Sequence, residues 1–165
     1  MPARALARGP LLLVYALSRQ SGQLLTTCFE DAPLTPDHFA VYSALRLVAP
    51  ATPSSLASTL GMRQSTLSGY LRRMEQRRHV VRRPHPHDGR SALIALTTSG
   101  IAVTEACFPH FQEAINPLLD RLGDDGPDIL AAMERLSAAM DEVIAAVGRE
   151  RAVGDAAIGD AAVGE

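Results

Sequence analysis

Apolar residues recur every three or four positions over most of this chain, and this spacing predicts helices. Within residues 10–30, Val14, Leu17, Leu24 and Cys28 fall on one face of a first helix. The sequence DAPLTPDHF that follows breaks the pattern with its prolines. One amphipathic helix is therefore predicted before the first turn.

A second helix is predicted to begin at Pro36, because Thr35 is a good N-cap and proline is favoured at the first helical position. Its inward residues are Phe39, Tyr42, Leu45 and, at the end of the stripe, Val48. A third, short helix has Thr52 as its cap, also before a proline, and ends at Leu60. Gly61 then supplies a residue that adopts a left-handed turn at no steric cost.

The fourth predicted helix runs from about Arg63 to about Arg78 and has two contrasting faces. Its apolar stripe contains Leu67, Tyr70, Leu71 and Met74. Its opposite face contains Ser65, Gly69, Arg72 and Gln76, flanked by Ser68 and Arg73. Small residues let a backbone approach closely, and arginine and glutamine can make paired hydrogen bonds to guanine and adenine edges. The outward face is therefore suited to the major groove of DNA.

A β-hairpin is predicted directly after this helix. Val80 and Val81 begin one strand, and the apolar run SALIAL, residues 91–96, returns as the second. Between them we expect a basic tip, RRPHPHDGR, in which Asp88-Gly89 supplies the turn. A hairpin in this place is a wing, and an arginine at its tip is favoured in a neighbouring minor groove.

Two further helices are predicted after the wing. The first has apolar residues at Phe108, Phe111, Ile115, Leu118 and Leu122. We expect Pro109 and Pro117 to bend or split it, because each removes a backbone hydrogen bond. The last helix carries a heptad seam of Ile129, Met133, Leu136, Met140, Val143 and Val147. Such a seam favours a dimer, with packing inside one chain as the alternative.

The glycine- and aspartate-rich residues 149–165 are expected to form a flexible tail.

Composition supports a mostly helical protein with an aliphatic core, because 47% of residues are hydrophobic, 4% are aromatic and tryptophan is absent. The net charge of −2 conceals a basic segment. From Arg63 to Arg90 there are eight arginines against Glu75 and Asp88, a net charge of +6. Such a segment in an otherwise acidic protein indicates a polyanion-binding surface, whereas the alternative is a solvated helix face with salt bridges.

Other classes of protein find less support. The sequence contains no nucleophile elbow, phosphate-binding loop, dinucleotide fingerprint or zinc-protease motif, which argues against an enzyme and gives no reason to expect a cofactor. The run LLLVYAL near the N-terminus is too short to span a membrane and is followed by no evident cleavage site. We therefore expect a cytoplasmic protein.

The chain resembles the MarR (multiple antibiotic resistance regulator) family of winged helix-turn-helix regulators, from about Leu34 to Val147. The strongest match is VVRRPHPHDGRSALIALTTSG, which follows the wing pattern of the family at Asp88, Arg90, Leu96, Thr97 and Gly100. The second match is LASTLGMRQSTLSGYLRRMEQRRHVVRR, the helix-turn-helix. The two motifs occur in the order and spacing that the family shows.

The resemblance implies a homodimer in which N- and C-terminal helices interlock and hold two winged domains. It also implies that Arg90 enters the minor groove and that Asp88 helps to fix the wing. With the helix face described above, the residues predicted to contact double-stranded DNA are Arg63, Gln64, Ser65, Thr66, Ser68, Arg72, Arg73, His87, Asp88 and Arg90. Gly69 and Gly89 depart from the family, because many relatives have arginine or a second basic residue there.

Relatives in this family bind phenolic or other aromatic carboxylates, so a small aromatic effector is expected. Tyr15, Tyr42 and Phe39 are candidates for its site, with core packing as the alternative. A redox response through Cys28 and metal binding by the wing histidines also remain open, although a buried cysteine and polar tip residues explain these positions as well. A winged helix that binds a protein instead of DNA is a further alternative.

The predicted organisation has four parts. Residues 1–34 form an N-terminal dimerisation helix, and residues 35–98 form the winged helix-turn-helix. Residues 99–148 form C-terminal dimerisation helices, and residues 149–165 form the tail. The predicted function is a ligand-responsive repressor that binds a pseudo-palindromic operator.

Overall fold

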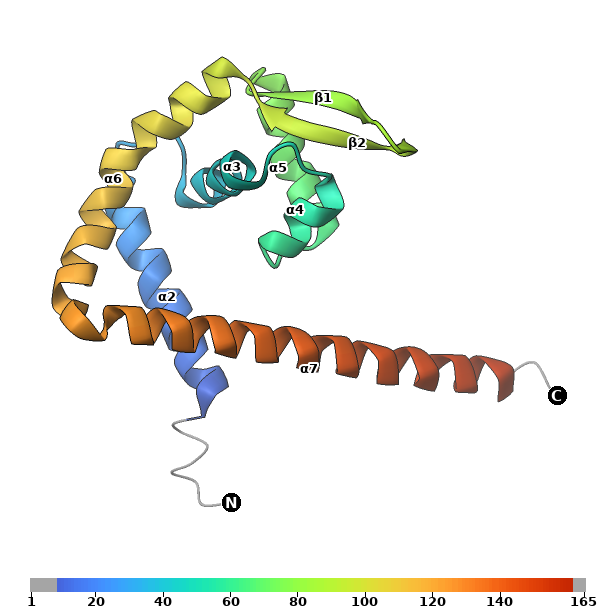
Figure 1. The fold of residues 1–165 in the computed structure, drawn as a ribbon. Helices are drawn as coiled ribbons and strands as arrows, with labels where there is room; N and C mark the ends of the chain where they lie inside the picture. The colour runs from blue at the N-terminus through green and yellow to red at the C-terminus, as the bar shows by residue number, and fades with distance from the viewer. Residues whose placement is uncertain (1–8, 162–165) are drawn as a thin grey trace. The chain divides into compact units, whose positions relative to one another are not determined.

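The computed structural model describes residues 9–161, except for the side chains of residues 89, 90 and 151–161. Its elements, labelled in Figure 1, are α2 (Pro10–Cys28), α3 (Pro36–Val48), α4 (Pro53–Thr59), α5 (Gln64–Gln76), β1 (Val80–His85), β2 (Asp88–Leu96), α6 (Thr98–Leu122), the 3-10 turn η1 (Gly123–Asp125) and α7 (Gly126–Ala161). The predicted fold class, mostly helical with one two-stranded hairpin, is confirmed. The chain divides between Pro117 and Leu118 into two compact units.

The capping residues act as the sequence predicts. Thr35 Oγ1 accepts a hydrogen bond from the backbone N–H of His38 at 3.4 Å, and α3 begins at the next residue, Pro36. Thr52 Oγ1 accepts from the backbone N–H of Ser55 at 3.1 Å. Each bond satisfies one of the N–H groups that a helix leaves without a partner in its first turn. Gly61 has the predicted left-handed conformation, with φ of 60°.

The core of the first unit is formed mainly where α3, α4 and α5 meet under the hairpin. Tyr42, Leu45, Leu56, Leu67, Leu71, Met74 and Ile94 are fully buried. These residues include most of the two apolar stripes predicted from the sequence. Val48 is an exception, because it is the last residue of α3 and its side chain is 39% exposed.

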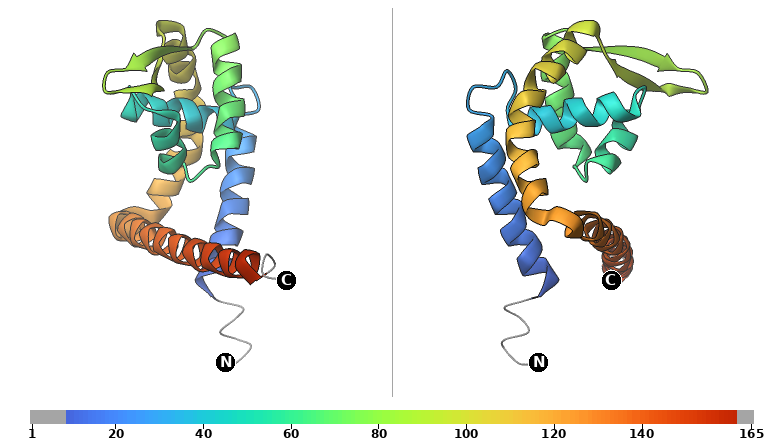
Figure 2. Two further views of the ribbon diagram at one scale, coloured as in Figure 1. Left: turned by 90° about the vertical axis from the view of Figure 1, so that its right-hand side faces the viewer. Right: turned by 60° about the vertical axis from the view of Figure 1, so that its left-hand side comes forward.

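The hairpin is longer than predicted, because the strands extend into the segment expected to be a loop. Its antiparallel register runs from Val80↔Leu96 to His85↔Asp88, and Pro86 and His87 make the turn in place of Asp88-Gly89. Proline has no backbone N–H, so it is compatible with an edge strand where that position faces solvent. Both strands of a two-stranded ribbon are edge strands. Ala51 adds a third short pairing to Ile94, with N–H···O distances of 3.1 and 2.8 Å. Figures 1 and 2 show the hairpin projecting beyond α3, α4 and α5.

Helix α6 is not split by its prolines: Pro109 and Pro117 both lie inside one helix, Thr98–Leu122. Each proline costs one hydrogen bond, and the remaining bonds carry the helix through both sites. The buried line differs from the predicted stripe. It contains Gly100, Thr104, Cys107 and Ala114, whereas Phe108 and Leu118 are exposed.

Helix α7 continues to Ala161 and so covers most of the segment expected to be a flexible tail; residues 162–165 of that prediction lie outside the described residues. An alanine-rich segment without proline adds turns to an existing helix without a new nucleation step, which explains the extension. The side chains of Ile129, Met133, Val143 and Val147 are exposed. The heptad seam therefore lies on the helix surface of this single chain.

Among the described helices, none is both long and apolar enough to span a membrane.

Candidate nucleic-acid interface

Helix α5 has one buried face and one exposed face. Leu67, Leu71 and Met74 are buried against the core. All the residues of this region predicted to contact DNA are exposed, namely Arg63, Gln64, Ser65, Thr66, Ser68, Arg72 and Arg73. A Cβ atom added to Gly69 would have no heavy atom within 4 Å, so open space lies beside this part of the helix. The structure therefore brings the predicted helix residues together on one accessible surface.

The two neighbouring arginines of α5 differ in their contacts. Arg73 donates from Nε to Nε2 of His38 at 3.2 Å, and its Cζ lies 5.0 Å from the centroid of the Tyr70 ring. Arg72 makes no hydrogen bond or ion pair with any other described residue. The sequence predicted that both arginines lie on the exposed side of α5, as the structure shows, but gave no signal for His38, which lies on α3.

The hairpin is tied to α5 by an ion pair between Arg82 Nε and a carboxylate oxygen of Glu75. Glu75 is one of the two acidic residues in the basic segment, and its carboxylate is paired with an arginine of the hairpin. Val81 and Arg83 remain exposed beside it. This contact was not predicted, and it ties the hairpin to α5.

The tip of the hairpin holds the remaining predicted residues. His87 and Asp88 are exposed, and the rings of His85 and His87 lie 6.3 Å apart. The backbone N–H of His87 donates to Nδ1 of His85 at 3.2 Å. Arg90 belongs to β2, but its side chain lies outside the described residues, so its predicted contact with the minor groove stays a prediction.

The motif Leu-Thr-x-x-Gly connects the end of the wing, through hydrogen bonds of Thr97, to the residues that precede the wing and to the start of α6. We call this set of hydrogen bonds the clamp. Thr97 donates from its backbone N–H to the carbonyl of His79 at 2.9 Å and from Oγ1 to the carbonyl of Arg78 at 2.9 Å. The same Oγ1 accepts from the backbone N–H of Gly100 at 3.1 Å, which places Thr97 at the start of α6. Arg78 has a positive φ of 57°, a conformation that these bonds help to hold.

A second contact anchors this corner to α3. Tyr42 Oη and His79 Nδ1 are hydrogen-bonded at 2.8 Å, and their rings meet edge to face. Burial lowers the pKa of His79, and the nearby Arg77 lowers it further. Burial is also the largest cause of the raised pKa of Tyr42. Both groups are therefore uncharged near neutral pH, which suits a bond in the interior.

The metal and redox alternatives gain little from the geometry. No group of three or more metal-binding side chains gathers within the described part of the chain. Cys28 is half-buried at the end of α2, and Cys107 is fully buried in α6. Burial raises the pKa of the Cys107 thiol, which reduces its reactivity.

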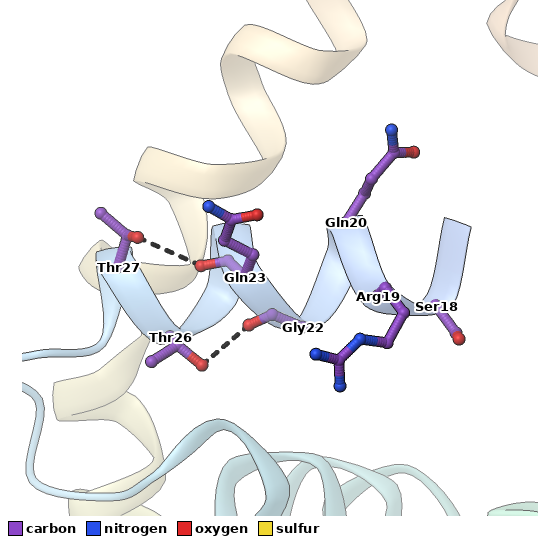
Figure 3. Close-up of a pocket in the computed structure, with 7 residues that line it drawn as sticks. All are labelled: Ser18, Arg19, Gln20, Gly22, Gln23, Thr26 and Thr27. Carbon is purple, nitrogen blue, oxygen red and sulfur yellow. Dashed lines mark hydrogen bonds between the residues drawn. The ribbon is translucent and has the colours of Figure 1, made fainter. Parts of the chain in front are cut away.

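Two hollows of similar size differ in what surrounds them. One, of about 520 Å³, is lined by residues of a single helix face: Ser18, Arg19, Gln20, Gly22, Gln23, Thr26 and Thr27. Figure 3 shows that two of these threonines hydrogen-bond to carbonyls of α2 itself. The described residues that line this surface all belong to α2, so it offers little to a ligand.

The other hollow, of about 580 Å³, lies between α2, α3 and α6 and is mostly apolar. Its lining residues are Leu25, Phe29, Pro36, Phe39, Ala40, Ser43, Arg46, Leu47, Phe108 and Phe111. Of the predicted candidates, Phe39 lines it, whereas Tyr42 lies in the core and Tyr15 is 64% exposed.

Two polar groups stand out in this apolar pocket. The hydroxyl oxygen of Ser43 is buried and has no hydrogen-bond partner among the described residues. Arg46 lies over the ring of Phe108, with its Cζ 5.5 Å from the ring centroid, and pairs with Glu105 at 3.0 Å. Pockets for small molecules commonly combine aromatic walls with a few polar groups of this kind.

Comparison with known proteins places this geometry in context. A family model described as the MarR family matches residues 32–91, which include all the residues predicted to contact DNA. The multiple antibiotic resistance protein MarR of Escherichia coli (strain K12) is 30% identical over 95 residues. This match covers 58% of the present chain and 66% of that protein, slightly less than two thirds of its length. The transcriptional repressor NicR of Pseudomonas putida is 29% identical over 106 residues, with coverages of 58% and 67%.

Solved structures extend the similarity beyond the matched segment. The apo form of wild-type MarR from E. coli has a TM-score of 0.64 at 26% identity, covering 77% of this chain and 95% of that chain. A mutant of the same protein complexed with operator DNA has a TM-score of 0.68 at 25% identity, covering 82% and 97%. The MepR–DNA complex from S. aureus has a TM-score of 0.67 at 25% identity, covering 79% and 98%.

Proposed function

The chain belongs to the MarR family of transcriptional regulators, and we propose that it represses transcription as a homodimer bound to a pseudo-palindromic DNA site. The observation that carries the proposal is the exposed polar and basic face of α5, whose other face is buried and whose neighbour is a projecting hairpin. Repression is proposed because a similar protein, NicR, is named a repressor. A regulator of this kind acts on DNA in the cytoplasm and needs no catalytic group.

In this proposal α5 enters the major groove and the hairpin reaches the adjacent minor groove. Ser65 and Arg72 face base edges, because they occupy the centre of the exposed face. The flanking contacts come from Arg63, Gln64, Thr66, Ser68 and Arg73. At the wing, His87 and Asp88 lie at the tip, and Arg90 enters the minor groove.

Replacement of Arg72 by alanine is expected to weaken binding by about 1–3 kcal/mol, because the side chain would lose a paired hydrogen bond to a base or a phosphate. Fluorescence anisotropy with the duplex that the wild-type chain selects from a random pool, at several salt concentrations, measures the loss. A base contact relaxes the preference at one position, whereas a phosphate contact weakens all sequences and lowers the log–log salt slope by about 0.9.

Arg19→Ala is the matched control, because Arg19 is an exposed arginine of α2 outside the basic segment. We expect it to leave affinity and salt slope close to those of the wild type. Arg90→Ala in the same series tests the wing contact. If the wild type binds its selected duplex no more tightly than random DNA, the proposal is wrong and a protein-binding winged helix becomes the better explanation.

We further propose that the apolar pocket between α2, α3 and α6 takes a small aromatic carboxylate that releases the DNA. Phe29, Phe39 and Phe111 offer aromatic walls, and Arg46 offers a cation for the carboxylate. The buried hydroxyl of Ser43 offers a hydrogen bond to a phenolic or carboxylate oxygen. An anionic ligand would compete with Glu105 for Arg46.

Arg46→Gln is expected to weaken binding of salicylate about 10-fold, because a charge-assisted hydrogen bond is lost. Isothermal titration calorimetry with salicylate, and with uncharged salicyl alcohol as the comparison ligand, measures this difference. Glu105→Gln is the control, because it frees Arg46 from its ion pair and should not weaken salicylate binding. Equal salicylate affinities for wild type and Arg46→Gln would contradict the assignment of Arg46.

A further inference from the structure

The guanidinium of Arg73 is held from two sides by residues of two different helices. Its Nε–H donates to Nε2 of His38, on α3, at 3.2 Å. Its Cζ lies 5.0 Å from the ring centroid of Tyr70, one turn earlier on α5. Because Nε is used in the bond to His38, the four N–H groups on the two Nη atoms are left for other partners.

The ring of His38 is itself fixed in orientation. Nδ1 lies 2.8 Å from Oγ1 of Thr35, the residue that caps α3. The ring meets the edge of Tyr70 at a centroid distance of 5.0 Å and an angle of 79°. Tyr70 in turn donates from its hydroxyl to a carboxylate oxygen of Asp37 at 3.3 Å. The N-terminus of α3 thus supplies a prearranged group of side chains beside α5.

These contacts also define the protonation state of the histidine. Arginine can only donate, so Nε2 must be the accepting nitrogen and the proton must lie on Nδ1, from which it is donated to Thr35. Burial lowers the pKa of His38, and Arg73 and then Arg77 lower it further, whereas Asp37 opposes them. At neutral pH the ring is therefore uncharged, which is the form that can accept from Arg73.

We propose that His38 is a positioning residue for DNA binding: it holds Arg73 at the flank of α5 with its outer N–H groups directed to a phosphate. This inference rests on the proposed DNA-binding function. A free arginine side chain loses considerable rotamer freedom when it binds, and a side chain that is already ordered loses less. Arg73 is exposed, so the held guanidinium stays accessible to the phosphate backbone.

A double-mutant cycle tests the inference, with wild type, His38→Leu, Arg73→Ala and the double variant measured by anisotropy on the selected duplex at pH 7.5. We expect His38→Leu to lower affinity about 2- to 10-fold, as for the loss of one preordered side chain. We expect Arg73→Ala to lower it more and to reduce the salt slope by about 0.9. In the Arg73→Ala background, His38→Leu should have no further effect.

His38→Gln is the conservative variant, because the glutamine oxygen can still accept from Arg73; we expect it to recover most of the affinity. Thermal unfolding of each variant separates DNA binding from loss of fold. If the wild type binds its duplex selectively and the affinity losses of His38→Leu and Arg73→Ala add up in the double variant, the role of His38 is wrong and the proposed function stands. A wild type without selective DNA binding would overturn both the proposed function and this inference.

Discussion

Replacement of Gly100 by alanine is expected to lower the free energy of unfolding by about 3 kcal/mol, because overpacking a fixed site costs roughly 1–3 kcal/mol or more. A Cβ atom at this position would lie 2.1 Å from the carbonyl oxygen of His79 and 3.2 Å from Cδ2 of Leu96. That carbonyl is held by the backbone N–H of Thr97, so it cannot move away without breaking the clamp. Urea unfolding monitored by circular dichroism measures the change.

Gly69→Ala is the matched control, because it is also a glycine in a helix but has no heavy atom within 4 Å of the added Cβ. It is expected to raise stability by about 0.5–1 kcal/mol, since alanine restricts the unfolded chain more than glycine does. Both variants must be compared at one protein concentration, because the stability of the proposed dimer would depend on concentration. Equal urea midpoints for Gly100→Ala and the wild type would show that the close approach to His79 is relieved at little cost.

This clamp illustrates what the sequence could and could not predict. The motif Leu-Thr-x-x-Gly was recognised as a family pattern, yet its spacing did not reveal why glycine is needed. The reason is a contact between the start of α6 and the carbonyl of His79, which lies before the wing. In contrast, the caps at Thr35 and Thr52 were predicted, because a cap is decided by residues three positions away.

The candidate interface divides in the same way. The exposed face of α5 follows from the periodicity of Leu67, Leu71 and Met74, and the structure places that face outward. The partners of its side chains are not periodic neighbours: His38 is 35 residues from Arg73 in the sequence. No local pattern joins these two positions, so the contact required the fold. The unpartnered hydroxyl of Ser43 was missed for the same reason.

Two differences between the predicted and the observed elements involve prolines. The segment 82–90 was expected to form the tip between two short strands, but the strands extend into it, and a two-stranded ribbon has free edges on which Pro84 fits. Pro109 and Pro117 were expected to bend or split α6, and the helix is not split, because it continues through both positions. In each case the cost is one missing hydrogen bond, and the neighbouring structure is sufficient to offset it.

The combined replacements Met133→Glu and Val143→Glu are expected to convert a dimer to a monomer and to weaken operator binding about 100-fold or more. Both side chains belong to the heptad seam of α7, and they are 53% and 60% exposed in the single chain. Apolar residues in a sustained heptad stripe are favoured when they pack against a partner helix, and two buried carboxylates there would lack counterions. A monomer would retain one half-site of a two-fold operator, which removes much of the specific affinity.

Ala138→Glu with Ala145→Glu is the matched control, because these exposed alanines lie on the opposite face of α7 and the change in charge is identical. Sedimentation velocity at micromolar concentration and anisotropy on the selected duplex measure the two effects together.

The seam is the dimer interface if its variant alone becomes monomeric and loses affinity. A seam variant that stays dimeric would assign the interface to another apolar surface, of which α2 offers one in its exposed residues Leu11, Leu12, Leu13 and Tyr15. A seam variant that becomes monomeric yet binds as tightly as the wild type would instead contradict recognition of a two-fold operator, because a single winged domain would then account for the whole affinity.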